Sequence, residues 1–283
     1  MRMNLIDEEA FGQVCAELGR SREQRNPRSA NWRTRRFEAA RVAEKLPPKG
    51  TLLDIGCGAG FIPRYFHRLG FRVISTDFAD TGGVQALTAL IERGIEGHFL
   101  NVGADPLPVP DNSVDVVFAG NVVEHLPNSP RRFVADLKRV LKPGGFLVMD
   151  TKNAVDLKTR LKVLAGVSNW APLARFYDLE INPHHHKEYT LKELGQLLNL
   201  AGFEQIELYA FETFFQQSLR KFRTIHALGA TPGEANEFGS SFNPWHPYEY
   251  ARLGLLALAC LFPGLRTDIM AIGRKRKGDE GPA

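Results

Sequence analysis

Short, mostly apolar runs alternate with helix-like segments along the first half of the chain. Runs of this kind, with few polar positions, are typical of strands that are buried on both faces of a parallel sheet. They lie at 51–56, 71–77, 97–101, 114–120 and 146–150. The segments between them space apolar residues three and four positions apart, as helices with one buried face do. Those segments lie at 61–70, 83–94 and 129–145. The alternation predicts an α/β fold with a doubly wound, mostly parallel sheet.

The pattern becomes less regular in the second half of the chain. A helix is predicted at 190–202, where Thr190 and Glu193 have the spacing of a capping box. Strands are predicted at 203–211, where apolar and polar residues alternate, and at 266–275. With these two strands the expected sheet has seven strands.

The same pattern divides the chain into three parts. A polar helical cap at 1–49 ends in Leu-Pro-Pro-Lys-Gly, the main domain extends over 50–275, and a polar, flexible tail follows at 276–283. Within the main domain, 151–189 and 212–262 are long, aromatic-rich insertions. Long loops at the open edge of such a sheet are usually functional, so we expect these insertions to form a lid over a substrate.

The overall charge of the chain is mildly basic. The 283 residues carry a net charge of +4, with a pI of about 9.0. This permits anionic partners without requiring nucleic acid. Arginine is dense at 20–41. We expect this segment to be a solvated helix face; a landing surface for an anionic substrate or a membrane is the alternative.

The cysteines and the apolar segments bear on where the protein resides. Cys15, Cys57 and Cys260 are scattered without disulfide or metal spacing, which favours a reducing compartment. The N-terminus has no apolar core of signal-peptide length. The apolar run at 253–262 is shorter than the ~20 residues that span a bilayer. We therefore expect a cytoplasmic protein.

Three glycines follow the first predicted strand directly. Gly56, Gly58 and Gly60 stand between this strand and a predicted helix, which is a nucleotide-binding arrangement in general. The dinucleotide fingerprint places its third glycine one residue later, where this chain has Phe61. A phosphate-binding P-loop would continue with Lys-Ser or Lys-Thr, which is absent from this sequence.

Four motifs together resemble the class I S-adenosylmethionine-dependent methyltransferases. The spacing Asp-x-Gly-x-Gly-x-Gly at 54–60 is similar to the first motif of that family. Asp77 ends the second strand, 21 residues after Gly56, where a carboxylate can accept hydrogen bonds from both ribose hydroxyls. The segment 105–128 and the Leu-Lys-Pro-Gly-Gly at 141–145 are similar to the family's later motifs, in the same order. The resemblance covers about residues 50–150 and implies a Rossmann-like fold.

The resemblance also implies the cofactor, S-adenosyl-L-methionine, and the residues that contact it. These are Asp54, Gly56, Cys57, Gly58, Gly60, Asp77, Phe78, Asn101, Val102, Gly120 and Asn121. The family often has aspartate at the end of the third strand, and here an amide oxygen of Asn101 can accept the same bond from adenine. Family members commonly carry cysteine in the glycine loop without using it chemically, so we expect no nucleophilic role for Cys57.

The segment after the fourth strand bears on the methyl acceptor. Adenine and glutamine-amide methyltransferases carry Asn/Asp-Pro-Pro-aromatic there, whereas this chain has Gly120-Asn121-Val122-Val123. The segment looks instead like the small-molecule branch, which includes ubiquinone-biosynthesis O-methyltransferases and natural-product and sugar methyltransferases. The expected function is transfer of a methyl group to a small-molecule hydroxyl by in-line displacement.

Histidines in two segments are candidates for the general base. His125 follows the fourth strand and His186 follows the first insertion, and a histidine near the methyl group could take a proton from a hydroxyl. The alternative is that both are structural hydrogen-bonding or packing residues. No metal is expected, because neighbouring residues of the His184-His185-His186 run point to opposite sides and no third ligand is evident from the sequence.

Three other functions stay open at this stage. The apolar helix predicted at 247–264, with the arginine-rich segment, fits an enzyme that takes a lipid or quinone at a membrane surface. The basic segment also fits an RNA or protein methyltransferase, although nucleic acid is not the expected partner. A third alternative is an inert module that binds the cofactor only. The sequence leaves the oligomeric state open.

Overall fold

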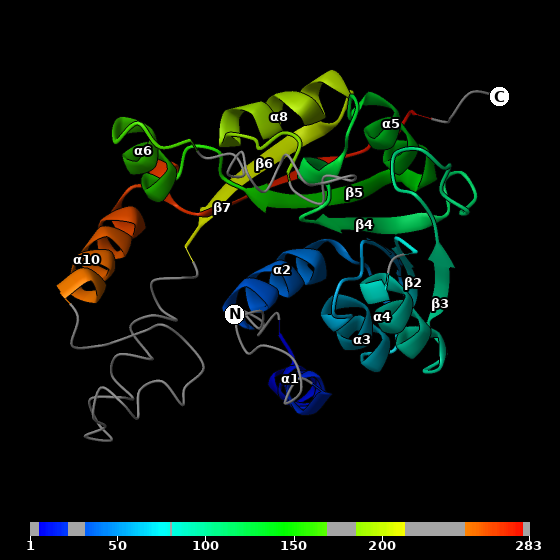
Figure 1. Cartoon of the computed structure of the whole chain (residues 1–283). Coiled ribbons are helices and arrows are strands. Elements are labelled where there is room, and N and C mark those ends of the chain that lie inside the picture. The colour runs from blue at the N-terminus through cyan, green and yellow to red at the C-terminus, as the bar shows by residue number, and fades with distance from the viewer. Residues whose placement is uncertain (1–5, 22–31, 80, 169–184, 213–246, 280–283) are drawn as a thin grey trace, which may run out of the picture.

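The structure is a computed structural model that describes residues 6–21, 32–79, 81–168, 185–212 and 247–279 (Figure 1). The expected lid insertions and the tail therefore lie partly outside the described residues. A seven-stranded sheet in the order β3-β2-β1-β4-β5-β7-β6 forms its centre. The strands are β1 Thr51–Ile55, β2 Arg72–Asp77, β3 Glu96–Phe99, β4 Val114–Gly120, β5 Leu141–Lys152, β6 Glu204–Phe211 and β7 Asp268–Arg274.

The strand directions confirm the doubly wound sheet and refine the expectation that it is mostly parallel. Strands β1 to β5 pair in parallel, whereas β7 is antiparallel to both of its neighbours, β5 and β6. The sheet is therefore mixed. The carboxyl ends of β1, β2, β4 and β5 meet at one edge of the sheet, which is where ligands bind in open α/β sheets.

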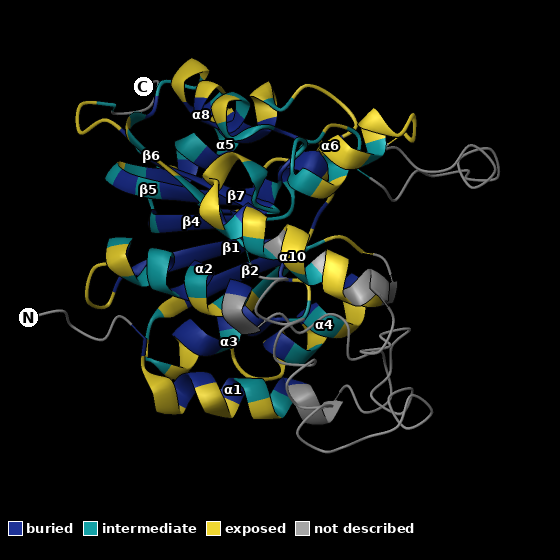
Figure 2. Ribbon diagram, turned by 90° about the vertical axis from the view of Figure 1, so that its left-hand side faces the viewer, coloured by how far each residue is buried: buried dark blue, intermediate teal, exposed yellow. Residues whose placement is uncertain are grey.

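Helices cover both faces of the sheet (Figures 1 and 2). On one face lie α1 Glu8–Ser21, α2 Trp32–Lys45, α3 Phe61–Arg68 and α4 Thr81–Ile91. On the other lie α5 Arg131–Val140 and α8 Leu191–Leu200. Two further helices, α6 Leu157–Leu164 and α10 Pro247–Leu261, contact each other beyond the strand ends, where β5 ends and β7 begins (Figure 1).

The alternation of side chains along each strand explains why the core has two halves. Leu52 and Val116 point toward the α1–α4 face, whereas the next residues, Leu53 and Val117, point toward α5 and α8. All four side chains are buried, so both faces of β1 and β4 must be apolar. This is the physical basis of the continuous apolar runs in the sequence.

The sequence of 129–145 predicts a helix with Ser129 as its N-cap, Pro130 as its first residue and Lys-Pro-Gly-Gly as the turn out of it, and the structure differs in these details. Lys142–Gly145, expected as the turn out of a helix, lies inside β5 as an irregularity, where Gly144 has a φ of +83°. The residue that precedes α5 is Pro130, and the Ser129 hydroxyl only accepts a hydrogen bond from the Arg131 amide, at 3.3 Å. The capping box of Thr190 and Glu193 at the start of α8 is present in full.

The structure also bears on the apolar C-terminal helix. Among the helices of the described ranges, α10 included, each is too short or too polar to cross a bilayer.

Candidate functional site

The glycine loop makes a tight turn between β1 and α3. Gly56, Gly58 and Gly60 all have positive φ, between +52° and +76°, which side chains rarely tolerate. A Cβ on Gly56 would lie 2.9 Å from Val122 Cγ2, and one on Gly60 would lie 3.0 Å from Leu90 Cδ2. The loop therefore needs glycine both for its conformation and for its close packing.

Asp77, at the end of β2, holds the glycine loop. Its Oδ2 accepts hydrogen bonds from the Gly58 amide at 2.9 Å and from the Cys57 thiol at 3.0 Å, and its Oδ1 accepts one from the Phe78 amide at 2.8 Å. Burial, with the charges of Asp54 and Asp77, raises the pKa of the Cys57 thiol, so the thiol stays protonated. Phe78 is half exposed beside this carboxylate.

Asp54, in β1, is a buried carboxyl group beneath the loop. Its side chain is 2% exposed and accepts a hydrogen bond from the Ser75 hydroxyl at 3.1 Å. Burial raises the pKa of Asp54 to about 7, against the opposing effects of Ser75 and the Arg35 guanidinium. The carboxyl group can therefore hold or release a proton near neutral pH.

Asn121 and Asp150 join the ends of β4 and β5. Asn121 has a φ of +55°, and both its amide and its side-chain Nδ2 donate to Asp150, to the carbonyl and to Oδ1, each at 2.9 Å. The other carboxyl oxygen of Asp150, Oδ2, has no hydrogen-bond partner among the residues that the structure describes. Burial raises the pKa of Asp150 well above its usual range. Gly120 lies just before this junction, at the end of β4.

Helix α2 brings an ion pair to the same edge. Arg35 donates to Glu38 Oε2 at 2.7 Å, and the charge of Arg35 acts on both Asp54 and Asp150. The Glu38 side chain is fully buried. The expectation that 20–41 is a solvated helix face is therefore wrong for this side of α2, although Arg36 on another side is half exposed and paired with Glu8. The sequence signal was an arginine and a glutamate three positions apart in a helix.

A second cluster forms at the 3₁₀ helix η2 (Val123–His125), which follows β4. The rings of His125 and His185 meet edge to face, with centroids 4.9 Å apart. His185 Nδ1 lies 2.8 Å from Glu188 Oε1, and this hydrogen bond raises the pKa of His185. The main-chain oxygen of Glu124 accepts a hydrogen bond from the His186 amide at 2.7 Å.

The two histidines predicted as general bases, His125 and His186, differ in how they contact the cluster. His125 lies in the cluster, whereas the contact described above for His186 is made by its main chain. His184 lies outside the described residues. Sequence reasoning missed His185, Glu124 and Glu188, because their meeting depends on how two distant segments cross.

Two predicted cofactor-contacting residues, Asn101 and Val102, lie beside Asp77. The amide of Leu100 donates to the Asp77 carbonyl at 3.1 Å, which places Asn101 and Val102 next to the end of β2. Both line a cavity of about 690 Å³. The Asn101 amide donates to Asp105 Oδ2 at 2.7 Å, so Asp105 holds the turn in which Asn101 sits.

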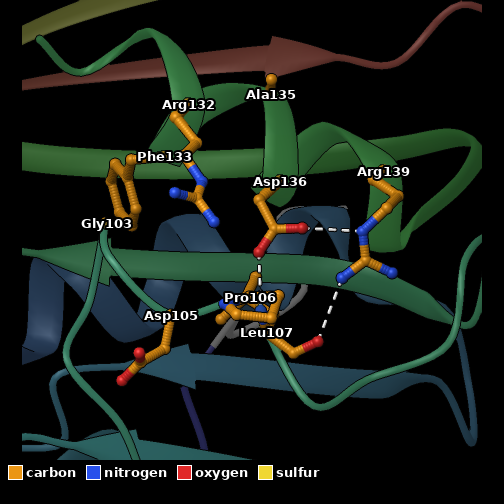
Figure 3. A pocket seen from close by; sticks show the side chains of 9 residues that line it. All are labelled: Gly103, Asp105, Pro106, Leu107, Arg132, Phe133, Ala135, Asp136 and Arg139. Carbon is orange, nitrogen blue, oxygen red and sulfur yellow. Dashed lines mark hydrogen bonds and ion pairs between the residues drawn. The ribbon is translucent and has the colours of Figure 1, made fainter.

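A smaller cavity, of about 280 Å³, lies between α5 and the segment 103–107 (Figure 3). Its polar groups hold the two elements together: Asp136 Oδ2 accepts from the Leu107 amide at 2.7 Å, and Arg139 donates to Asp136 Oδ1 at 2.7 Å and to the Leu107 carbonyl at 3.0 Å. These polar groups are hydrogen-bonded to one another, so we interpret the cavity as a packing feature between the two elements and not as a ligand site.

Comparison with known proteins finds similar S-adenosylmethionine-dependent methyltransferases. A family model described as a methyltransferase domain matches residues 53–149. A protein of Mycolicibacterium smegmatis, named a probable S-adenosylmethionine-dependent methyltransferase, is 32% identical over 176 residues, which are 62% of this chain and 60% of that protein. A ubiquinone biosynthesis O-methyltransferase of Dinoroseobacter shibae is 27% identical over 69% of this chain and 68% of its own length.

The fold has similar solved structures as well. Phosphoethanolamine N-methyltransferase 2 of Haemonchus contortus, in complex with phosphomonomethylethanolamine and S-adenosylhomocysteine, matches with a TM-score of 0.56 at 17% identity, over 85% of this chain and 52% of that one. At this identity the likeness concerns the fold alone. The chain spans less than two thirds of the length of the mycobacterial relatives it matches, 60% of one and 54% of another.

Proposed function

We propose that this chain, whose residues 53–149 match a methyltransferase-domain family model, is an S-adenosylmethionine-dependent methyltransferase that transfers a methyl group to a hydroxyl oxygen of a small molecule. The observation that carries the proposal is the contact between the glycine loop and the turn after β4. A Cβ on Gly56 would lie 2.9 Å from Val122 Cγ2, so the loop that faces the cofactor touches the turn that leads to His125.

Each part of the edge has a role in this proposal. When bound, S-adenosylmethionine supplies an electrophilic methyl group. The glycine loop and Asp77 hold its nucleoside part, with Asn101 and Val102 at the adenine. The cluster at η2 orients the acceptor and accepts its proton through His125, because an imidazole can exchange a proton near neutral pH. Positioning of the acceptor oxygen about 3 Å from the methyl carbon supplies much of the remaining rate enhancement.

The relatives support oxygen as the acceptor atom. The Dinoroseobacter shibae relative is named for O-methylation and its match covers two thirds of both chains. The N-methyltransferase of Haemonchus contortus is similar in fold only, at 17% identity. An oxygen acceptor also needs a proton acceptor, which the histidine cluster provides.

A second candidate is an acceptor that resides in a membrane, such as a lipid or a quinone. One observation favours it: α6 and α10, which contact each other, expose large apolar side chains, Leu164 at 82% and Leu261 at 72%. Helix α6 also carries Lys158 and Lys162. Helices that bind at anionic lipid surfaces combine apolar and basic side chains in this way.

Two measurements test the proposed function. Calorimetry with S-adenosylhomocysteine tests the cofactor site, and binding of NADH in its place would contradict our assignment. Methyl transfer from radiolabelled S-adenosylmethionine is then followed on phenols, catechols, sugars, amines, RNA and a protein mixture, each with and without anionic vesicles. We expect label in a hydroxyl compound. Label confined to amines, RNA or protein would contradict O-methylation of a small molecule, and label that depends on vesicles would select the membrane acceptor. Cofactor binding without label in any arm would favour the inert module.

A further inference from the structure

Three side chains with ligand atoms converge at η2. Glu124, His125 and His185 each contribute one potential ligand atom, a carboxylate oxygen or a ring nitrogen, and these three atoms lie within 4.8 Å of one another. The first two residues belong to the turn after β4, and the third belongs to the segment that precedes α8. The His186 amide bonds the Glu124 carbonyl at 2.7 Å, so a main-chain hydrogen bond fixes the two segments against each other.

Glu124 is the unusual member of this group. Its side chain is fully buried, and neither carboxylate oxygen has a hydrogen-bond partner within the described ranges. A buried carboxylate without a partner is costly unless it binds a proton or a cation. Something in this site therefore has to compensate the carboxylate.

His185 has the surroundings of a metal ligand. Glu188 Oε1 lies 2.8 Å from its Nδ1, so Nε2 is the nitrogen left to face a ligand. In metal sites, a carboxylate commonly takes the second ring N–H of a ligating histidine in this way, which sets the tautomer and the ring orientation. The edge-to-face contact with His125 brings the second imidazole to the same place.

We propose that Glu124, His125 and His185 bind a divalent transition-metal ion, with Zn²⁺ as the best match. Two imidazoles and one carboxylate are a zinc donor set, and an ion held by three protein ligands keeps a position open for another oxygen. Bonds of about 2.0–2.2 Å place tetrahedral ligand atoms roughly 3–3.5 Å apart, so the three side chains close by a small rotamer adjustment when the ion binds. Magnesium, which prefers oxygen ligands, fits less well.

The inference gives the site a chemical class of acceptor, and in this respect it rests on the proposed function. An acceptor hydroxyl bound at the open position loses its proton more readily, because the cation stabilises the alkoxide or phenolate. With the ion bound, His125 is a ligand and no longer the proton acceptor, so the proton of the hydroxyl passes to solvent. The oxygen lone pair then forms the O–CH₃ bond, while the electron pair of the S–CH₃ bond returns to sulfur and S-adenosylhomocysteine leaves. Acceptors with two adjacent hydroxyl groups, such as catechols, would suit the ion best because they chelate.

The first experiment measures metal binding without any methyl transfer. The full chain is freed of metal by chelation, and Zn²⁺ is titrated by calorimetry at pH 7.5. We expect one equivalent to bind, and His185→Gln and His125→Gln to weaken binding at least a hundredfold. His67→Gln is the matched control, because this exposed histidine lies in α3, remote from η2 in the sequence, and should bind as the unchanged protein does.

Two further readouts protect this test from a folding defect. Co²⁺ bound in place of Zn²⁺ to the unchanged chain should give visible absorption bands of a nitrogen- and oxygen-ligated ion, and Zn²⁺ should displace it. Glu188→Gln should weaken Zn²⁺ binding about ten- to a hundredfold, as loss of an outer carboxylate does. Failure to bind one equivalent of Zn²⁺, or equal binding by the His125 and His185 variants, would overturn the metal site.

Measurements on the metal-free and Zn²⁺-loaded chain test the metal site and the proposed function separately. S-adenosylhomocysteine binding is measured with and without Zn²⁺, and we expect similar affinities, because the glycine loop and Asp77 do not belong to the metal site. A chain that binds Zn²⁺ but methylates no hydroxyl compound would refute the proposed function and leave the metal site standing. Methylation of hydroxyl compounds that persists undiminished in the metal-free chain would overturn the role of the ion.

Discussion

The carboxyl ends of β1 and β2 and those of β4 and β5 lie along one edge of the sheet, but they are built from different parts of the chain. At β1 and β2, one carboxylate, Asp77, holds the glycine loop through the Gly58 amide and the Cys57 thiol, and it also accepts from the adjacent Phe78 amide. At β4 and β5, the site draws on α2, the turn 121–125, Asp150 and the segment 185–188. The first region is local in sequence, and the second is assembled from distant segments.

The two regions also differ in how their charges are satisfied. Both oxygens of Asp77 accept hydrogen bonds within the structure. At β4 and β5, by contrast, oxygens of Glu38, Glu124 and Asp150 are buried and have no hydrogen-bond partner in the part of the chain that the structure describes. The loop is thus complete before any ligand arrives, whereas the second region depends on protons, cations or an acceptor. This difference suits a common cofactor on one side and a particular acceptor on the other.

The largest expected effect separates two neighbouring histidines. His185→Gln should lower turnover about 10²–10⁴-fold, the contribution of a group that handles the acceptor proton or its ion. His186→Gln should change turnover only about threefold or less. The described contact of His186 is made by its main-chain amide, which this substitution keeps, whereas a catalytic side chain contributes far more. Steady-state kinetics with an identified acceptor would measure both. Equal losses in the two variants would remove the distinction between them.

A second prediction uses the pH dependence of stability. The folded chain keeps Asp54 protonated up to about pH 7, whereas an unfolded aspartate titrates near 3.9. Unfolding therefore releases a proton between these values, and Asp54 makes the free energy of unfolding fall as pH rises through this window, by at most about 4 kcal/mol. Asp54→Asn should remove this part of the slope.

Guanidinium unfolding at pH 5 and pH 8 measures the difference between the unchanged chain and Asp54→Asn. Other buried carboxyls contribute to both proteins and cancel. Ser75→Ala removes the hydroxyl that lowers the pKa of Asp54, so in this variant the loss of stability should extend to higher pH. If Asp54→Asn keeps the full slope, Asp54 does not carry this proton.

A third prediction concerns the packing of the loop against the β4 turn. Gly56→Ala should lower the free energy of unfolding by about 2–4 kcal/mol, since the new Cβ is strained at positive φ and meets Val122. Gly70→Ala is the matched control: its φ is +82°, but no described atom lies within 4 Å of a new Cβ, so only the conformational cost of about 1–2 kcal/mol applies. Equal losses would show that the contact with Val122 relaxes freely.

The smallest expected effect concerns the cofactor carboxylate. Asp77→Ala should weaken binding of S-adenosylhomocysteine roughly ten- to a hundredfold, as expected for two lost hydrogen bonds of about 1 kcal/mol each at a partly exposed site. Glu96→Ala, on the neighbouring strand β3, is the control and should bind normally. Calorimetry on the folded variants measures both. Unchanged affinity in Asp77→Ala would show that the ribose binds elsewhere.

The comparison explains how far the sequence could predict this site. The seven strands, the glycine loop and the position of Asp77 follow from local patterns, because a buried strand and a tight turn restrict the residues at each position. The choice between His185 and His186 could not be made, since neighbouring residues face opposite ways and the crossing of two segments distant in sequence decides which one meets His125. Burial of Glu38 was likewise hidden, because α2 is polar overall and its buried side depends on the sheet edge it covers.

Two main-chain hydrogen bonds fix the ends of the first insertion to the rest of the domain. The Ala154 amide donates to the Tyr189 carbonyl at 2.9 Å, so the two ends of the insertion lie side by side. The His186 amide donates to the Glu124 carbonyl and holds the second end against η2. The hydrogen bonds that hold both ends of this insertion thus lie outside α6. A sequence change within α6 should therefore leave His125, His185 and the glycine loop in place, because each is held by contacts outside that helix.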